Sequence, residues 1–147
     1  ESNGNQATTI GDTSIYMSES DQTVEFDNEI QLNFPVLMEG KVVLQDNIIN
    51  MRSDTAMVQL HVNMSYQWVD CTRASRYHLN ILTPAKHISI PCGLLDTLSM
   101  CHLDKMVLIK VYKGETLKTY LTKDAQKDNN DKLLIEGASY ISIKLIL

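Results

Sequence analysis

The chain has 147 residues, of which 44% are hydrophobic and 21% are charged. A domain of this size buries roughly 70% of the surface that its unfolded chain exposes, so it can fold without a disulfide scaffold or a metal. The composition excludes a disordered or collagen-like chain, and no apolar run reaches the roughly 18 residues that a membrane span requires. The formal net charge of −5 has the wrong sign for a nucleic-acid-binding protein.

The N-terminal part of the sequence is strongly acidic. Residues 1–40 hold eight of the 18 acidic residues and none of the 13 basic ones. This segment is either a solvated face or a surface attracted to the more basic remainder of a neighbouring subunit. Residues 1–11 are polar and lack the basic and apolar regions of a signal peptide, so we expect a linker there and a single domain at 12–147.

Period-two alternation of apolar and polar residues dominates the sequence after residue 12. Its clearest run is Ala56 to Val69, which predicts a strand with one dry face. A strand of that length would span nearly 50 Å at about 3.4 Å per residue, so we expect a bulge, a bend or a projecting end. Further strands are predicted at Ser14 to Met17, Ile30 to Phe34, Lys41 to Leu44, Tyr77 to Ile81, His87 to Ile90, Met106 to Tyr112, Leu117 to Leu121, Leu133 to Glu136 and Ala138 to Leu147.

Two of the remaining segments have patterns of their own. Met106 to Val111 is apolar at nearly every position, which is typical of a strand covered on both faces. Between Leu94 and Asp104, the residues Leu94, Leu98 and Cys101 are spaced about one helical turn apart. This segment could therefore form one short helix or remain without one. Eight to ten strands separated by short turns predict an all-β fold, an antiparallel β-sandwich of the jelly-roll type.

Residues that could carry chemistry are scattered along the chain. It has no Gly-x-Ser-x-Gly sequence and no glycine-rich phosphate loop, so we expect no enzyme, no catalytic residue and no cofactor. Three cysteines allow at most one disulfide: Cys71 with Cys92, both next to turns, is the natural pair, and three reduced thiols are the alternative. No metal is expected, because tight pairs are missing among Cys71, His78, His87, Cys92, Cys101 and His102.

The loop after the long strand holds the residues best suited to a ligand. Two arginines can grip a carboxylate, hydroxyl groups can bond to a sugar, and an aromatic ring can pack on its apolar side. The alternative is that both arginines pair with acidic residues of the N-terminal segment or with solvent. The first interpretation predicts a site for a sialic-acid-like ligand at Thr72, Arg73, Ser75, Arg76 and Tyr77.

A polar lead-in, one all-β domain and a last strand from Ser139 to Leu147 make the chain similar to the C-terminal head of an adenovirus-type viral attachment fibre. The family's Thr-Leu-Trp-Thr junction is missing, and Asp12 to Met17 stands in its place. The resemblance implies that residues 1–11 end a fibre shaft. It also implies a homotrimer on the virion surface, made inside the host cell, that attaches to a protein or a sialylated glycan on the cell surface.

A tumour-necrosis-factor-like ligand is the rival resemblance. Ala56 to Cys71 is similar to that family's central strand, Pro91 to Gly93 to the segment of its second disulfide cysteine, and Tyr140 to Leu147 to its closing strand. The family's Gly-Leu-Tyr and Phe-Gly are replaced here by Asp54-Thr-Ala and Ile141-Ser. This resemblance implies an extracellular trimeric cytokine with a cell-surface receptor. A disulfide between Cys71 and Cys92 would favour the cytokine, whereas free thiols and sialylated ligands would favour the viral head.

Trimer formation also has a physical reason. A sandwich exposes edge strands, and seven methionines, with Tyr66 and Trp68 on a strand longer than the core requires, predict an apolar patch that a symmetric neighbour covers. We therefore expect a homotrimer. The two resemblances imply that its partner is a host cell-surface receptor, and the composition and charge lead us to expect neither nucleic acid nor membrane insertion.

Overall fold

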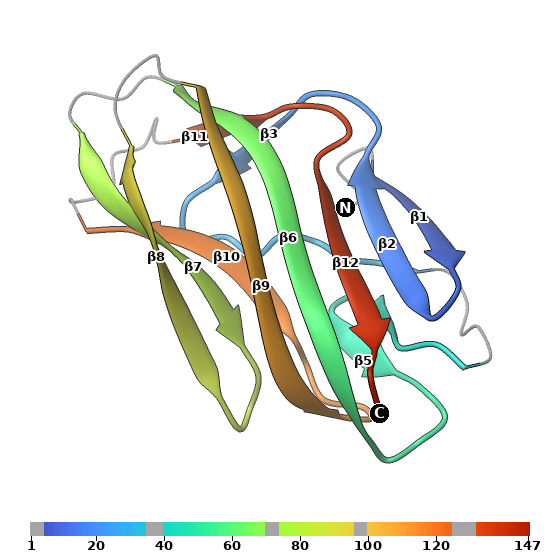
Figure 1. Cartoon of the computed structure of the whole chain (residues 1–147). Coiled ribbons are helices and arrows are strands. Elements are labelled where there is room, and N and C mark those ends of the chain that lie inside the picture. The colour runs from blue at the N-terminus through green and yellow to red at the C-terminus, as the bar shows by residue number, and fades with distance from the viewer. Residues whose placement is uncertain (1–4, 35–39, 70–73, 96–99, 125–131) are drawn as a thin grey trace.

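The computed structural model describes residues 5–34, 40–69, 74–95, 100–124 and 132–147, and the regular elements in these ranges are β-strands (Figure 1). The predicted all-β class is therefore confirmed. Within these ranges no helix is long and apolar enough to cross a membrane. The strands are β1 (Asn5–Ile10), β2 (Thr13–Ser18), β3 (Gln22–Glu25), β4 (Val43–Gln45), β5 (Ile48–Asn50), β6 (Thr55–Val69), β7 (Ser75–Leu82), β8 (His87–Leu95), β9 (Met100–Tyr112), β10 (Lys118–Lys123), β11 (Lys132–Ile135) and β12 (Tyr140–Leu145).

The strands form an antiparallel sandwich of a large and a small sheet. The large sheet runs β1-β2-β12-β6-β11-β3, and β9 pairs with β6 off this path. The small sheet has the order β10-β7-β8, and β4 and β5 form a separate hairpin. In Figure 1 the large sheet lies in front, with β10 passing behind it. The core fills the space between the two layers.

Strand β6 is the centre of the large sheet, and its length has a structural reason. Along one edge it pairs first with β12 and then with β11, whereas β9 follows the other edge from Thr55 to Gln67. Two short strands thus share one edge of a 15-residue strand. The pairing with β9 keeps its register throughout, and the strand curves along its length (Figure 1). The irregularity instead lies between β7 and β8, at Tyr77 and His78.

Aromatic rings on the inward side of β6 join the two layers. The ring centroids of Tyr66 and Tyr77 lie 5.9 Å apart in an edge-to-face arrangement, and those of Phe26 and Trp68 lie 5.8 Å apart. Tyr66 and Trp68 are 0% and 2% exposed, so the expectation that they belong to a surface patch is wrong. Alternate residues of a strand face opposite sides, and the even-numbered residues of β6 face the core.

The segment expected to be a linker contributes a strand. Asn5–Ile10 pairs residue for residue with β2, from Asn5 with Ser18 to Ile10 with Thr13. The domain therefore includes residues well before the expected start at 12. A tight turn at Gly11, whose φ is +59°, connects the two strands. Backbone pairing joins β1 to β2, and Ala7 packs against the core.

Two other expectations are corrected. The described residues between Leu94 and Asp104 belong to β8 and β9, so the short helix is not formed there. Leu103 is buried against the core while its neighbours alternate outward, as period two requires. Ile30 to Phe34 has the expected alternation of burial but is not a regular strand. Its backbone hydrogen bonds are made to different segments and not to one neighbouring strand. Ile30 N donates to Thr119 O, and Phe34 N donates to Leu44 O.

Candidate functional site

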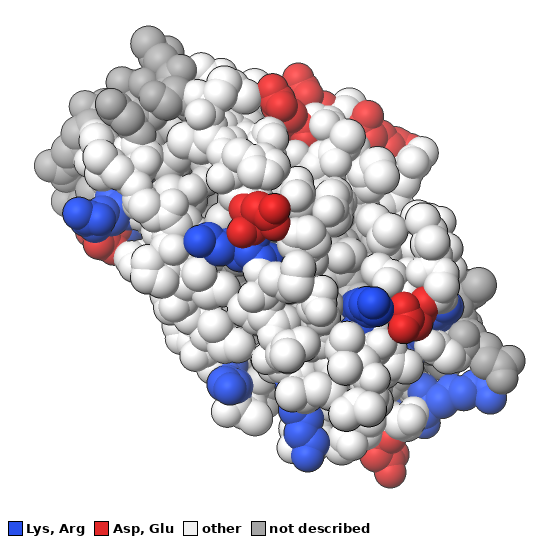
Figure 2. Space-filling model, in the orientation of Figure 1, with Lys and Arg blue, Asp and Glu red and all other residues white. Residues whose placement is uncertain are grey.

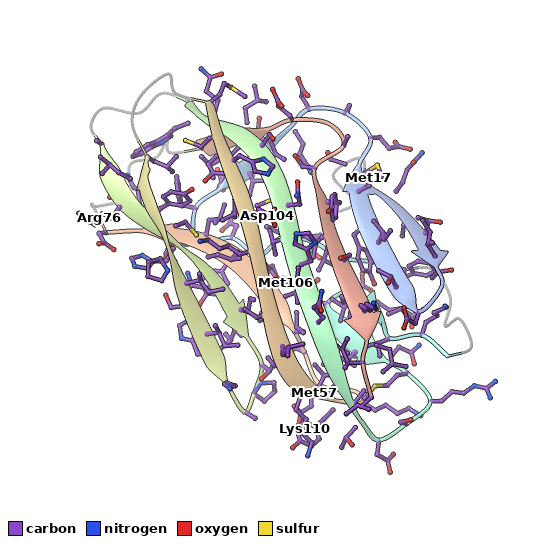
Figure 3. The ribbon with its side chains drawn as sticks, viewed as in Figure 1. Met17, Met57, Arg76, Asp104, Met106 and Lys110 are labelled. Atoms are coloured by element: carbon purple, nitrogen blue, oxygen red, sulfur yellow. The ribbon has the colours of Figure 1, made fainter. Side chains whose placement is uncertain are left out.

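The outward side of the large sheet carries apolar side chains that the described residues leave largely exposed. On β9, Met106 and Leu108 are 54% and 58% exposed. The pairing registers place outward residues of β2, β12 and β6 beside them on the same side. Figure 3 shows Met17, Met57 and Met106 over these strands. We call this surface the open face and define it by Ile15, Met17, Met57, Met106, Leu108 and Tyr140.

The open face arises from the sequence of β9. Its inward residues Leu103, Ile109 and Val111 are at most 2% exposed. The residues at the alternate positions, among them Met106 and Leu108, must therefore point outward. The apolar run of β9 predicts a strand that is buried on both faces. This prediction is wrong for the single chain, because one face of β9 is exposed. Figure 2 shows this side of the molecule as mostly uncharged, with few Lys, Arg, Asp or Glu side chains across its middle.

Polar side chains on the same side of β6 and β9 are paired with one another. His61 Nε2 lies 2.5 Å from Asp104 Oδ1, and the His61 ring meets the ring of Tyr140 edge to face, with centroids 5.4 Å apart. His102 Nδ1 lies 3.0 Å from the hydroxyl of Ser65. These pairs satisfy part of the hydrogen-bonding capacity of the face within the sheet, which lowers the cost of covering it.

The structure separates the residues of the predicted glycan site. Thr72 and Arg73 lie outside the described residues. Ser75 and Tyr77 are buried, and the Ser75 hydroxyl donates to the carbonyl of Arg76. Arg76 is exposed at the end of β7, far from the open face (Figure 3). The expected packing of Tyr77 on a sugar is corrected, because its ring packs in the core on the other side of the strand from Arg76.

Cys92 and Cys101 are partly buried free thiols. Of the two alternatives that the sequence left open, a disulfide or reduced thiols, the reduced state is found for Cys92 and Cys101, and Cys71 lies outside the described residues. The Cys92 thiol donates to the carbonyl of Ile90 at 3.2 Å. Burial raises the pKa of both described thiols. Among the residues that the structure describes, no group of three or more His, Cys, Asp or Glu side chains could hold a metal ion.

Cys92 and Cys101 are expected to react slowly with iodoacetamide at pH 7. The thiolate is the reactive form, and a raised pKa lowers its fraction at neutral pH. The rate should increase with pH above 8 and when the protein is unfolded in urea, and peptide mass spectrometry can follow each cysteine separately. Alkylation of either thiol at pH 7 as fast as a short cysteine peptide would contradict the burial.

No protein family and no curated protein sequence matches the chain, but its fold has counterparts among solved structures. Eiger TNF from S. frugiperda matches with a TM-score of 0.56 over 92% of each chain, at 10% sequence identity. The chain has a TNF-like jelly-roll fold. The PRD1 vertex protein P5 matches 98% of this chain and 83% of its own at 13% identity, with a TM-score of 0.49. At 10% identity the match to Eiger TNF shows a likeness of fold alone, and the adenovirus-type fibre head remains a prediction.

The sequence contained part of the signal for this site. The residues of the open face lie at alternating positions in predicted strands, but the same alternation fits side chains under a second layer. Met57 and Met17 carry no local mark that separates a covered from a bare face. The pairing order of the sheet was needed to bring β2, β12, β6 and β9 onto one surface.

Proposed function

We propose that this chain is a homotrimeric recognition domain without enzymatic activity, which binds a receptor on a cell surface. The open face packs against neighbouring copies, and the loops and the small sheet remain free for the receptor. The observation that carries the proposal is the pair Met106 and Leu108, both more than half exposed on the edge strand β9, where it pairs regularly with β6.

An exposed apolar surface on a well-ordered sheet is typical of a protein interface. Methionine side chains suit such a surface because they are flexible and fill irregular gaps. The open face ends at β9, which pairs only with β6 among the described strands. Contact between the β9 edge of one copy and the open face of the next joins two different surfaces. Such contacts form a ring when the rotation between copies closes and an open filament when it does not, and the trimer proposed here is the closed case.

Two more specific identities fit a trimeric recognition domain. One is the head of a viral attachment fibre on the virion surface, with a sialylated glycan as the ligand of Arg73 and of Arg76, which is exposed near the start of β7. The other is an extracellular ligand of the tumour-necrosis-factor type. The fold shared with Eiger TNF supports the second, whereas the free thiol of Cys92 supports the first.

Sedimentation equilibrium tests the assembly directly. We expect a mass about three times the chain mass of 16.6 kDa at micromolar concentration, because burial of the open face favours association. A monomer under these conditions would overturn the proposal. A dimer would also overturn it, since a two-fold contact needs one self-complementary patch rather than an edge against a face.

A further inference from the structure

We infer that the outward side of the small sheet holds a binding groove for a neutral carbohydrate. The inference rests on the proposed function only in that a neutral carbohydrate would be the receptor, in place of the sialylated glycan considered for Arg73 and Arg76. The groove lies on the opposite side of the sandwich from the open face, so assembly through the open face leaves it accessible.

The groove has the size of a ligand site. Its volume is about 500 Å³, within the range of roughly 300–1,000 Å³ that small-molecule sites occupy. Two other cavities hold only about 20 and 50 Å³ and are too small for a sugar ring. The floor of the groove is formed by Leu82 of β7 and by Lys118 and Tyr120 of β10. These three side chains point outward, because their neighbours Ile81, Thr119 and Leu121 face the core.

The ring of Tyr120 is fixed before any ligand arrives. The ring of His87 stacks on it, with centroids 6.4 Å apart and planes inclined by 28°. His87 Nε2 donates to Asn80 Oδ1 and Asn80 Nδ2 donates to Thr122 Oγ1, each at 2.9 Å. Asn80 is only 4% exposed, so this network is itself held in place. A pre-positioned aromatic face can pack on the C–H face of a sugar with little loss of side-chain entropy.

The wall of the groove supplies hydrogen-bonding groups. It consists of the segment from Asp27 to Gln31, whose side chains in the groove are Asp27, Asn28, Glu29 and Gln31. Gln31 Nε2 donates to Glu29 Oε1 at 3.1 Å, which orients that carboxylate. Asp27 adopts a left-handed backbone conformation, with φ of 68°, of the kind that concentrates at turns and functional sites. Carboxylates and amides together can accept from and donate to sugar hydroxyl groups.

The charges of the groove select among sugars. Two carboxylates, Asp27 and Glu29, face a single ammonium group, Lys118, whose Nζ lies 3.9 Å from Glu29 Oε2. An anionic sugar such as sialic acid would meet net repulsion here. A lysine-rich peptide would be attracted by the carboxylates. The aromatic and aliphatic floor and the two amides favour a neutral sugar over such a peptide.

A glycan array probed with the full-length protein tests the groove, using neutral and sialylated oligosaccharides on the same surface. We expect binding to neutral glycans, which Tyr120→Ala lowers at least tenfold by removing the aromatic floor. Asn28→Ala, on the exposed wall, should lower it at least threefold. Tyr112→Ala removes a half-buried tyrosine of the large sheet and should leave binding unchanged. Thermal unfolding of each variant shows whether a loss of binding comes from a loss of folding, and the exposed position of Asn28 keeps the test valid if Tyr120→Ala unfolds.

Several results would overturn the inference. The first is that no neutral glycan binds, and the second is that binding survives both groove variants. The third is that neutral glycans do not bind but a fluorescent lysine-rich peptide does, and that Tyr120→Ala abolishes the binding of this peptide. Binding to sialylated glycans alone would also overturn it. Each of these results leaves the trimer untouched, because sedimentation measures the assembly independently. A monomer that binds neutral glycans through Tyr120 would instead overturn the assembly and keep the groove.

Discussion

Leu108→Glu is expected to convert the trimer into monomers at micromolar concentration. Leu108 lies on the open face opposite Gln59 and is 58% exposed in the single chain. In the proposed trimer a neighbouring copy would cover its side chain, so glutamate would place an unpaired charge in each of three interfaces. A factor of ten in a dissociation constant corresponds to about 1.4 kcal/mol, so a penalty of several kcal/mol weakens association at least about 100-fold. Sedimentation velocity over a range of concentrations measures this change.

Leu94→Glu is the matched control. Leu94 has nearly the same exposure, 59%, but lies on β8 of the small sheet, opposite Arg76. The same substitution there should leave the trimer intact. Circular dichroism of both variants should retain the β-sheet spectrum, because each substituted side chain points away from the core. A trimer that withstands Leu108→Glu and dissociates with Leu94→Glu would move the interface from the large sheet to the small one.

The sequence was most informative where burial is one-sided. The alternation of Ala56 to Val69 predicted β6 almost to the residue, because each inward position contacts the core and each outward position does not. Periodicity could not show which neighbour covers a strand. Met106 to Val111 was therefore expected to be covered on both faces, and only the sheet order revealed the bare side.

Other features depend on contacts between distant segments. The hairpin of Asn5–Ile10 with β2 is held by backbone pairing between polar residues, so hydrophobic periodicity could not mark it. Tyr77 was assigned to a ligand because it follows Arg76 closely in sequence, yet strand geometry turns the two side chains to opposite sides. Backbone hydrogen bonds between the wall segment and β10 bring Asp27 and Tyr120 together in the groove. No local sequence pattern indicates this contact.

Leu60→Ala is expected to lower the free energy of unfolding by about 2 to 5 kcal/mol, since deletion of a buried leucine side chain loses transfer energy and leaves a cavity. Leu60 is fully buried in the middle of β6, between Ile143 of β12 and Val107 of β9, so neighbouring strands cannot easily close the gap. Urea unfolding in the monomeric Leu108→Glu background separates folding from dissociation. Leu94→Ala deletes the same atoms at an exposed position and should change the free energy by no more than about 0.5 kcal/mol. Equal effects of the two deletions would contradict the placement of Leu60 in the core and, with it, the inward and outward assignment from which the open face follows.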